Sequence, residues 1–273
     1  LLLLLLPCWW GVALFGHGSG HSVLMLLWYG VLFGIGALAM RGAGCTWNDI
    51  TDRDIDGKVA RTATRPIPSG QVSVKQALAF IVLQALVGLA VLTQFTLPAA
   101  ITAIASLGVV AVYPFMKRYT QLPQVVLGAA FSWSIPMAFV ATGQSISWIV
   151  WTLYFANLTW TVAYDTQYAM VDKNDDIKVG VKSTAILFGQ YDKLSILLLQ
   201  IVSLLLLTTT AQLLKLSWPF YLALLISVSL FLYQHWLIKD RDRSLCFKAF
   251  LHNHFVGLVF ALGIIGHYSI YPA

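Results

Sequence analysis

The sequence contains no glutamate, and its eleven acidic residues are all aspartate. Charged residues as a whole are scarce: they make up 10% of the chain, whereas soluble globular domains carry about a quarter. This scarcity excludes a mainly aqueous surface. In their place, 59% of the 273 residues are apolar. Because a membrane-spanning helix needs about 20 predominantly apolar residues, the chain has room for roughly eight or nine such helices with short loops. We expect one membrane domain that covers residues 1–273.

Other absences narrow the function. The three cysteines, Cys8, Cys45 and Cys246, lie far apart and lack the spacing of metal ligands. The chain has no GxGxxG or P-loop pattern and no arrangement of nucleophile and base, so nucleotide use is not indicated. Leu1–Leu6 has neither a preceding basic segment nor a following cleavage signal. We expect it to belong to a first membrane helix whose upstream part is missing from this sequence.

The apolar residues form nine segments separated by short breaks that contain glycine, proline or polar residues. Backbone polar groups inside lipid have no water partner, so each segment must satisfy them internally as a helix. We therefore predict an all-α, polytopic bundle of about nine transmembrane helices. The predicted segments are 1–16, 22–44, 74–97, 99–115, 122–142, 146–170, 193–214, 217–238 and 248–270.

Basic residues alternate between the predicted loops. Sixteen of the seventeen Lys and Arg residues lie in or beside the loops after the second, fourth, sixth and eighth segments, and only Lys215 lies in another loop. This is the positive-inside pattern of membrane proteins. It predicts that these four loops and the amino terminus lie on the cytoplasmic (or matrix) side, with the carboxyl terminus outside. The net charge of +6 is therefore a signal of topology and not of nucleic-acid binding.

Most of the acidic residues form two clusters, each at the end of an apolar segment. The first cluster comprises Asn48, Asp49, Asp52, Asp54 and Asp56. At about 100° per helical residue, four of these side chains share one face and Asp54 points away. We call Asn48, Asp49, Asp52 and Asp56 the first acidic stripe.

The second cluster ends the sixth segment. Asp165, Asp172 and Asp176 fall within about 40° of one another on a helix, so three carboxylates form a second acidic stripe. Two such stripes repel each other unless a cation lies between them. Their hard oxygen ligands, without Cys or His, favour Mg²⁺ or Mn²⁺ over zinc or copper. Basic residues follow both stripes, and together these groups indicate a metal-dependent diphosphate site.

Two other interpretations of the acidic clusters are open. The aspartates are solvated loop charges in the first, which requires both stripes to be in helical register by coincidence. In the second, the protein is a transporter of divalent cations or lipid phosphates. Transporter sites lie near the middle of the membrane, whereas the middle of each predicted segment is free of Asp, Lys and Arg.

The two stripes resemble the aspartate motifs of the UbiA superfamily of intramembrane prenyltransferases. The first motif is Asn48-Asp49-x-x-Asp52-x-x-x-Asp56, and the second is Asp172-x-x-x-Asp176 preceded by Tyr164-Asp165. Other stretches resemble the 4-hydroxybenzoate polyprenyltransferases of ubiquinone biosynthesis, and the resemblance covers nearly the whole chain. These stretches are Gly42–Cys45, Arg61–Pro66, Tyr113–Arg118, Leu122–Gln124, Tyr164–Ala169 and Lys182–Ala185.

The resemblance implies nine membrane helices around a central cavity, with Mg²⁺ as cofactor and with polyprenyl diphosphate and 4-hydroxybenzoate as substrates. The loops that carry both motifs would cap the cavity. The implied Mg²⁺ ligands are Asn48, Asp52, Asp172 and Asp176. Supporting catalytic roles would fall to Asp49, Asp56 and Asp165. The implied diphosphate-binding residues are Arg61, Arg65, Tyr113 and Lys117.

We expect the reaction to begin with departure of diphosphate, whose developing charge Mg²⁺ and the basic residues would neutralise. The ring carbon ortho to the hydroxyl of 4-hydroxybenzoate would then attack the allylic cation. Arg118 is the candidate for binding the carboxylate of the acceptor, and Asp165 for orienting the phenol or accepting its proton. Aromatic side chains such as Tyr164 and Tyr168 are candidates for stabilising the cation.

Some properties stay open at this point. The acceptor could instead be homogentisate, a naphthoate or haem. The isoprenoid chain length, the oligomeric state and the choice between a bacterial and a mitochondrial inner membrane are not determined by the sequence.

Overall fold

The structure, a computed structural model, describes residues 1–17, 19–57, 62–144 and 146–271. These residues form eleven α-helices and one 3₁₀ helix, with no β-strand among them. The helices are α1 (Leu2–His17), α2 (Val23–Asp56), α3 (Val74–Leu92), α4 (Leu97–Tyr119), α5 (Pro123–Ser132), α6 (Ser134–Ala141), α7 (Trp148–Val179), α8 (Thr184–Phe188), η1 (Gly189–Tyr191), α9 (Asp192–Leu213), α10 (Trp218–Leu237) and α11 (Arg243–Ile270).

The predicted all-α fold is confirmed, and each of the nine predicted segments corresponds to one helix or a pair of helices. The fifth segment, predicted as 122–142, is divided at Trp133 into α5 and α6. Pro136 accounts for the division, because proline has no N–H to donate and its ring clashes with the carbonyl four residues earlier.

Two helices extend well beyond their predicted ends. The predicted segment 22–44 continues as α2 to Asp56, and the predicted segment 146–170 continues as α7 to Val179. Both acidic stripes are therefore helical. A short helical turn, α8 with η1, also precedes the predicted segment 193–214.

Seven helical stretches of the described chain are long and apolar enough to cross a membrane, and the protein is a multi-pass membrane protein. Its outer surface agrees with this. For example, α3 buries only Ala77 and Val91, and it exposes large apolar side chains that include Leu83 and Leu86. An apolar surface of this extent is stable against lipid and not against water.

The helix α7 packs against α5, α9 and α11, and its side chains form much of the core. Trp160 of α7 stacks on Trp10 of α1, with ring centroids 5.5 Å apart. Where α11 crosses α10 at close range, the contact requires glycine: a Cβ atom on Gly263 would lie 2.8 Å from the Cβ atom of Ala223 and 3.2 Å from the backbone of Phe220.

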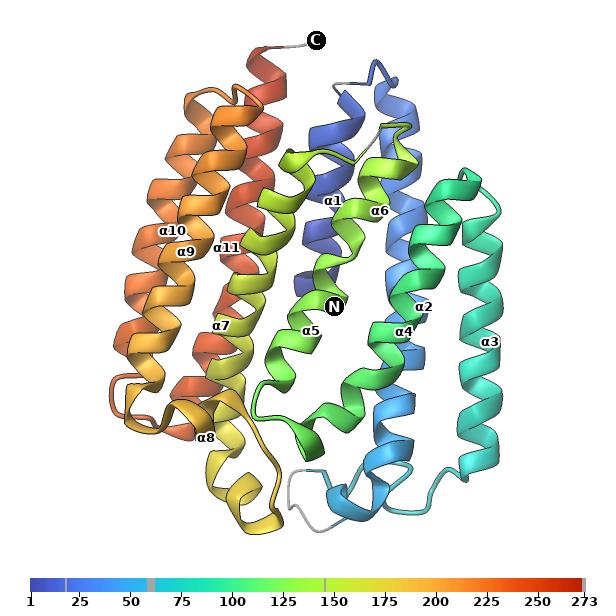
Figure 1. Cartoon of the computed structure of the whole chain (residues 1–273), viewed down its shortest axis with the longest axis vertical. Helices are drawn as coiled ribbons and strands as arrows, with labels where there is room; N and C mark the ends of the chain where they lie inside the picture. Colours follow the sequence, from blue (N-terminus) through green and yellow to red (C-terminus); the bar gives the residue numbers. More distant parts are fainter. Residues whose placement is uncertain (18, 58–61, 145, 272–273) are drawn as a thin grey trace.

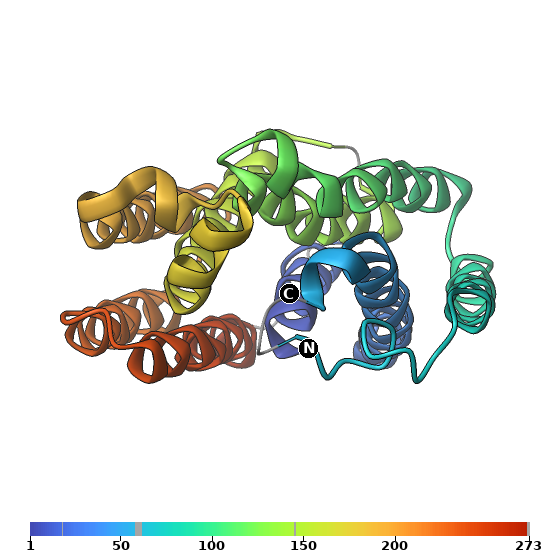
Figure 2. The same ribbon diagram turned by 90° about the horizontal axis from the view of Figure 1, so that it is seen from below.

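The connections α2–α3, α4–α5, α7–α8 and α10–α11 lie at one end of the bundle, at the bottom of Figure 1. We call this the charged end, and Figure 2 views the molecule from that side. The α9–α10 connection, which contains Lys215, lies at the opposite end. The four basic loops that the sequence predicts on one side of the membrane are thus together in space. In both views α3 lies at one edge of the bundle and α10 at the other.

Candidate active site

A cavity of about 990 Å³ opens among helices α1 to α7, and both acidic stripes contribute to its wall. From the first stripe, Asn48, Asp49 and Asp56 line the cavity. Asp54 has an exposed side chain, as its position on the helical wheel predicts. Away from the charged end, the wall is apolar and includes Leu89, Leu107, Phe131 and Met137.

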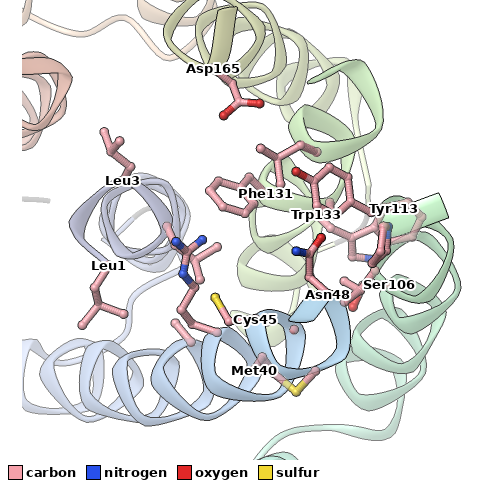
Figure 3. Close-up of a pocket in the computed structure, with 18 of the residues that line it drawn as sticks. Leu1, Leu3, Met40, Cys45, Asn48, Ser106, Tyr113, Phe131, Trp133 and Asp165 are labelled. Carbon is pink, nitrogen blue, oxygen red and sulfur yellow. The ribbon is translucent and has the colours of Figure 1, made fainter. Parts of the chain in front are cut away.

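All three members of the second stripe, Asp165, Asp172 and Asp176, line the same cavity. Figure 3 shows Asp165 on α7 and Asn48 on α2 projecting from opposite sides into the space between the helices. The two stripes, which are separated by more than a hundred residues in the chain, are therefore brought together by helix packing. This arrangement concentrates negative charge on two walls of one chamber.

Arg65, from the α2–α3 connection, closes one side of the first stripe. Its Nη1 atom donates hydrogen bonds to Asp49 at 2.7 Å and to Asp56 at 3.2 Å. Arg65 also lines the cavity, as do Tyr113 and Lys117 from α4. Three of the four predicted diphosphate-binding residues thus face one chamber. The fourth, Arg61, lies outside the described residues.

Asp52 differs from the rest of the first stripe. Its side chain is fully buried, is not among the residues that line the cavity, and forms ion pairs with Lys117 and Arg118 of α4. Arg118 also donates to the backbone carbonyl of Thr51. The predicted acceptor-binding residue Arg118 is therefore directed at α2 and not into the cavity.

At the charged end, the segment that joins α7 to α8 binds residues of α4 and α5 and completes the chamber. The backbone N–H of Lys182 donates to the carbonyl of Lys117 at 2.9 Å, and the N–H of Thr184 donates to Oε1 of Gln124 at 3.0 Å. Lys117, Lys182 and Gln124 all line the cavity. The α7–α8 connection is thereby attached to α4 and α5, which keeps basic side chains beside the second stripe.

Residues 4–261 match the UbiA prenyltransferase family. The chain belongs to this family. Curated relatives are similar over nearly their full length: a 4-hydroxybenzoate octaprenyltransferase of Enterobacter sp. (strain 638) is 52% identical over 268 residues, which cover 98% of this chain and 91% of the relative. The enzyme of the same name from Yersinia pseudotuberculosis is 48% identical over 267 residues, with the same two coverages.

The UbiA fold is also found in solved structures at low sequence identity. A UbiA homologue from Aeropyrum pernix K1 superimposes with a TM-score of 0.82 at 21% identity, covering 97% of this chain and 96% of the homologue. A UbiA homologue from Archaeoglobus fulgidus, bound to GPP and Mg²⁺, has a TM-score of 0.64 at 18% identity and covers 98% and 95% of the two chains. These likenesses show that the bundle described above has the UbiA architecture.

Sequence reasoning missed one cation in the cavity of this UbiA-family chain. Arg41 lies within α2, lines the cavity and is close enough to Asp165 for its charge to act on that carboxylate. A signal was available, since Arg41 precedes Asn48 by seven residues, which places the two side chains within about 20° on the helix. Because Arg41 was grouped with the charges of the following loop, the helical face that it shares with Asn48 was not recognised.

The donor set of the UbiA chamber suits a hard divalent cation that a substrate helps to hold. Among the described residues, no group of three or more His, Cys, Asp or Glu side chains is gathered tightly enough to hold a metal ion. However, Mg²⁺ usually takes only one or two protein carboxylates and completes its shell with water and phosphate oxygens. Carboxylates on two facing walls, with basic residues between them, fit an ion that is bound together with a diphosphate.

Proposed function

We propose that this chain transfers a polyprenyl group from polyprenyl diphosphate to the ring carbon ortho to the hydroxyl of 4-hydroxybenzoate, with release of diphosphate, as in ubiquinone biosynthesis. The observation that carries the proposal is a single cavity in which two acidic stripes and basic side chains meet an apolar chamber. The choice of acceptor is supported by the curated relatives, which are about half identical over 98% of the chain and carry the name 4-hydroxybenzoate octaprenyltransferase.

The diphosphate is bound at the charged end. Arg65, Tyr113 and Lys117 bind its oxygens, together with Arg61 from outside the described residues. Asn48, Asp52, Asp172 and Asp176 would hold Mg²⁺, with Asp49 and Asp56 in support. Because Lys117 both pairs with Asp52 and lines the cavity, it can turn to the diphosphate and leave Asp52 to the metal. When bound, Mg²⁺ supplies Lewis-acid stabilisation of the leaving group.

The chemistry requires one bond to break and one to form. The allylic carbon–oxygen bond breaks, and its electron pair leaves with the diphosphate. The ring carbon of the acceptor then bonds to the allylic carbon, and the proton on that ring carbon passes to the released diphosphate, which restores the aromatic ring. Tyr113, Tyr164 and Tyr168 line the cavity, and their aromatic faces stabilise the developing positive charge. Asp165 orients the phenol or accepts its proton, because it projects into the same space.

We assign the carboxylate of the acceptor to Arg41 in place of Arg118. Arg41 lines the cavity near Asp165, whereas the guanidinium of Arg118 is bound to Asp52 and to the backbone of Thr51. The planar guanidinium of an arginine can bind one carboxylate with two parallel hydrogen bonds. The polyprenyl tail occupies the apolar part of the cavity, between residues such as Leu89 and Phe131.

The membrane placement follows from the charged end. In the sequence, every Lys and Arg residue except Lys215 lies in or beside the four loops whose described parts form the charged end, and such an excess favours the cytoplasmic or matrix face. We infer a single UbiA-type domain in an inner membrane, with the active site opening on that face.

The experiment that tests the function uses membranes containing the protein, geranyl diphosphate and labelled 4-hydroxybenzoate, with Mg²⁺ or with EDTA. We expect a prenylated product that requires Mg²⁺ and is lost in Asp176→Ala. A parallel panel of homogentisate, a naphthoate and haem tests the acceptor. Product on one of these and none on 4-hydroxybenzoate would move the chain to another acceptor class. Product that persists in EDTA, or in Asp176→Ala, would contradict the role of the acidic stripes.

A further inference from the structure

A fully buried carboxylate lies at the charged end outside the cavity. Asp192 is the first residue of α9, and its side chain has no exposed surface. Nε of Arg241 donates to both carboxylate oxygens, at 3.1 and 2.9 Å, and Nη2 of Arg241 donates to Oδ1 at 2.7 Å. A buried carboxylate is stable only when its oxygens are satisfied in this way. Arg241 therefore ties the α10–α11 connection to the start of α9.

The backbone conformation of Arg241 indicates that its side-chain hydrogen bonds are strong enough to offset local strain. Its φ angle is +56°, in the left-handed region that costs a non-glycine residue free energy. In this conformation Nη2 also donates to the carbonyl of Gln190 at 2.9 Å. The hydrogen bonds to Asp192 and Gln190 hold the backbone of the connection in this state.

The same carboxylate reaches the helix that carries the second acidic stripe. Nζ of Lys173, the residue that follows Asp172 in α7, donates to the carbonyl of Gly189 at 3.0 Å and lies 3.5 Å from Oδ2 of Asp192. The α10–α11 side makes a second link. Nη2 of Arg243 donates to Asp175 at 2.8 Å, one residue before Asp176. Lys173 follows Asp172 in the chain and Asp175 precedes Asp176, and both of these adjacent residues are thus bound to the C-terminal half of the bundle.

We propose that Asp192 is a positioning residue for the second acidic stripe. Through Lys173 and Arg241 it anchors the last turns of α7, so that Asp172 and Asp176 keep their places on the cavity wall although their charges repel each other. None of the four residues Lys173, Asp192, Arg241 and Arg243 lines the cavity, so they act from behind it. The inference rests on the proposed function, in which Asp172 and Asp176 bind metal together with diphosphate.

The first test compares Asp192→Asn with Asp240→Asn in the whole membrane domain in detergent. Asp240 lies in the same α10–α11 connection, but its 74% exposed side chain pairs only with Lys239 among the described residues. The same change of charge is thus made without touching α7. Two readouts are independent of turnover: binding of Mn²⁺ in the presence of inorganic diphosphate, and hydrogen exchange of residues 171–179 against residues 45–56.

We expect Asp192→Asn to weaken Mn²⁺ binding by about 10-fold or more, the usual effect of removing a residue that orients a metal ligand. Exchange should become faster in 171–179 and stay unchanged in 45–56, and the KM for 4-hydroxybenzoate should not change. Asp240→Asn should match the wild type. Wild-type binding and exchange in Asp192→Asn, or equal losses in Asp240→Asn, would overturn the proposal.

A second test covers the case in which Asp192→Asn does not fold. Lys173→Gln keeps Asp192 and its hydrogen bonds to Arg241 but removes the ion pair that links Asp192 to α7. It should weaken Mn²⁺ binding and speed exchange in 171–179, as Asp192→Asn does. Wild-type Mn²⁺ binding and exchange in Lys173→Gln would then overturn the proposal. If the wild type binds Mn²⁺ and diphosphate but prenylates no 4-hydroxybenzoate, the proposed function fails while these binding tests still decide the role of Asp192.

Discussion

Arg65 and Asp49 are joined by a hydrogen bond of 2.7 Å that folds the α2–α3 connection back over the end of α2. The same Nη1 atom reaches Asp56 at 3.2 Å, so one guanidinium holds two carboxylates of the first acidic stripe. The stripe therefore has a fixed position before any substrate is bound. This relationship makes Arg65 sensitive to a change that keeps its charge but alters its shape.

Replacement of Arg65 by lysine should lower kcat/KM for the polyprenyl diphosphate by roughly 10- to 100-fold. Lysine keeps the charge but loses the planar fork that spans Asp49 and Asp56, and a hydrogen bond to a charged group contributes about 1.5–3 kcal/mol. Steady-state kinetics in membranes would measure the loss. The matched control is Arg53→Lys, because Arg53 is 51% exposed and pairs with the exposed Asp54. Equal activity of the two variants would contradict the role of Arg65.

Arg41 and Arg118 should respond differently to replacement by glutamine. Arg41→Gln should raise the KM for 4-hydroxybenzoate by about 10-fold or more, because a charge-assisted hydrogen bond to the carboxylate is lost. Arg118→Gln should leave that KM unchanged and raise the Mg²⁺ concentration needed for half-maximal rate, because it disturbs Asp52. Titrations of acceptor and of Mg²⁺ with both variants separate these effects. The reverse pattern would return acceptor binding to Arg118.

Gly263→Ala should destabilise the bundle by about 1–3 kcal/mol, the usual cost of overpacking. The new methyl group would meet Ala223 and the backbone of α10, and backbone atoms cannot turn away as a flexible side chain can. Thermal unfolding in detergent would register a lower Tm. Gly34→Ala is the control, since a Cβ atom there meets nothing within 4 Å. A Tm for Gly263→Ala at or above that of the control would show that α10 and α11 have room to separate.

Gln234→Met should destabilise the protein by about 1–2 kcal/mol, the range seen for hydrogen bonds between membrane helices. Oε1 of Gln234 accepts hydrogen bonds from Gln167 at 3.1 Å and from Gln200 at 3.0 Å, so its removal leaves two buried donors without an acceptor. Unfolding curves would be compared with those of Gln212→Met, an exposed site on α9. Similar stability of the two variants would mean that the amides of Gln167 and Gln200 find other partners.

Much of this protein could be predicted from local patterns. Long apolar runs determine helices in lipid, because no other structure satisfies the backbone there, and the alternation of basic loops orders their ends. Helical register then assigns each aspartate to a face, so the sequence alone predicts that Asp54 lies on a different face of the helix from Asp49 and Asp56. The family resemblance likewise depends on short motifs that are readable without coordinates.

What only the tertiary structure decided is which neighbour each face meets. Register placed Asp52 with the first stripe, but the packing of α4 against α2 buries it against Lys117 and Arg118. The same packing turns Arg118 away from the cavity and leaves Arg41 inside it. The period of a helix determines directions around its own axis, whereas the partner in each direction depends on contacts between segments that are distant in the chain. For that reason the sequence by itself determined the membrane helices, the two stripes and the family, and the fold decided which charged residues share the cavity.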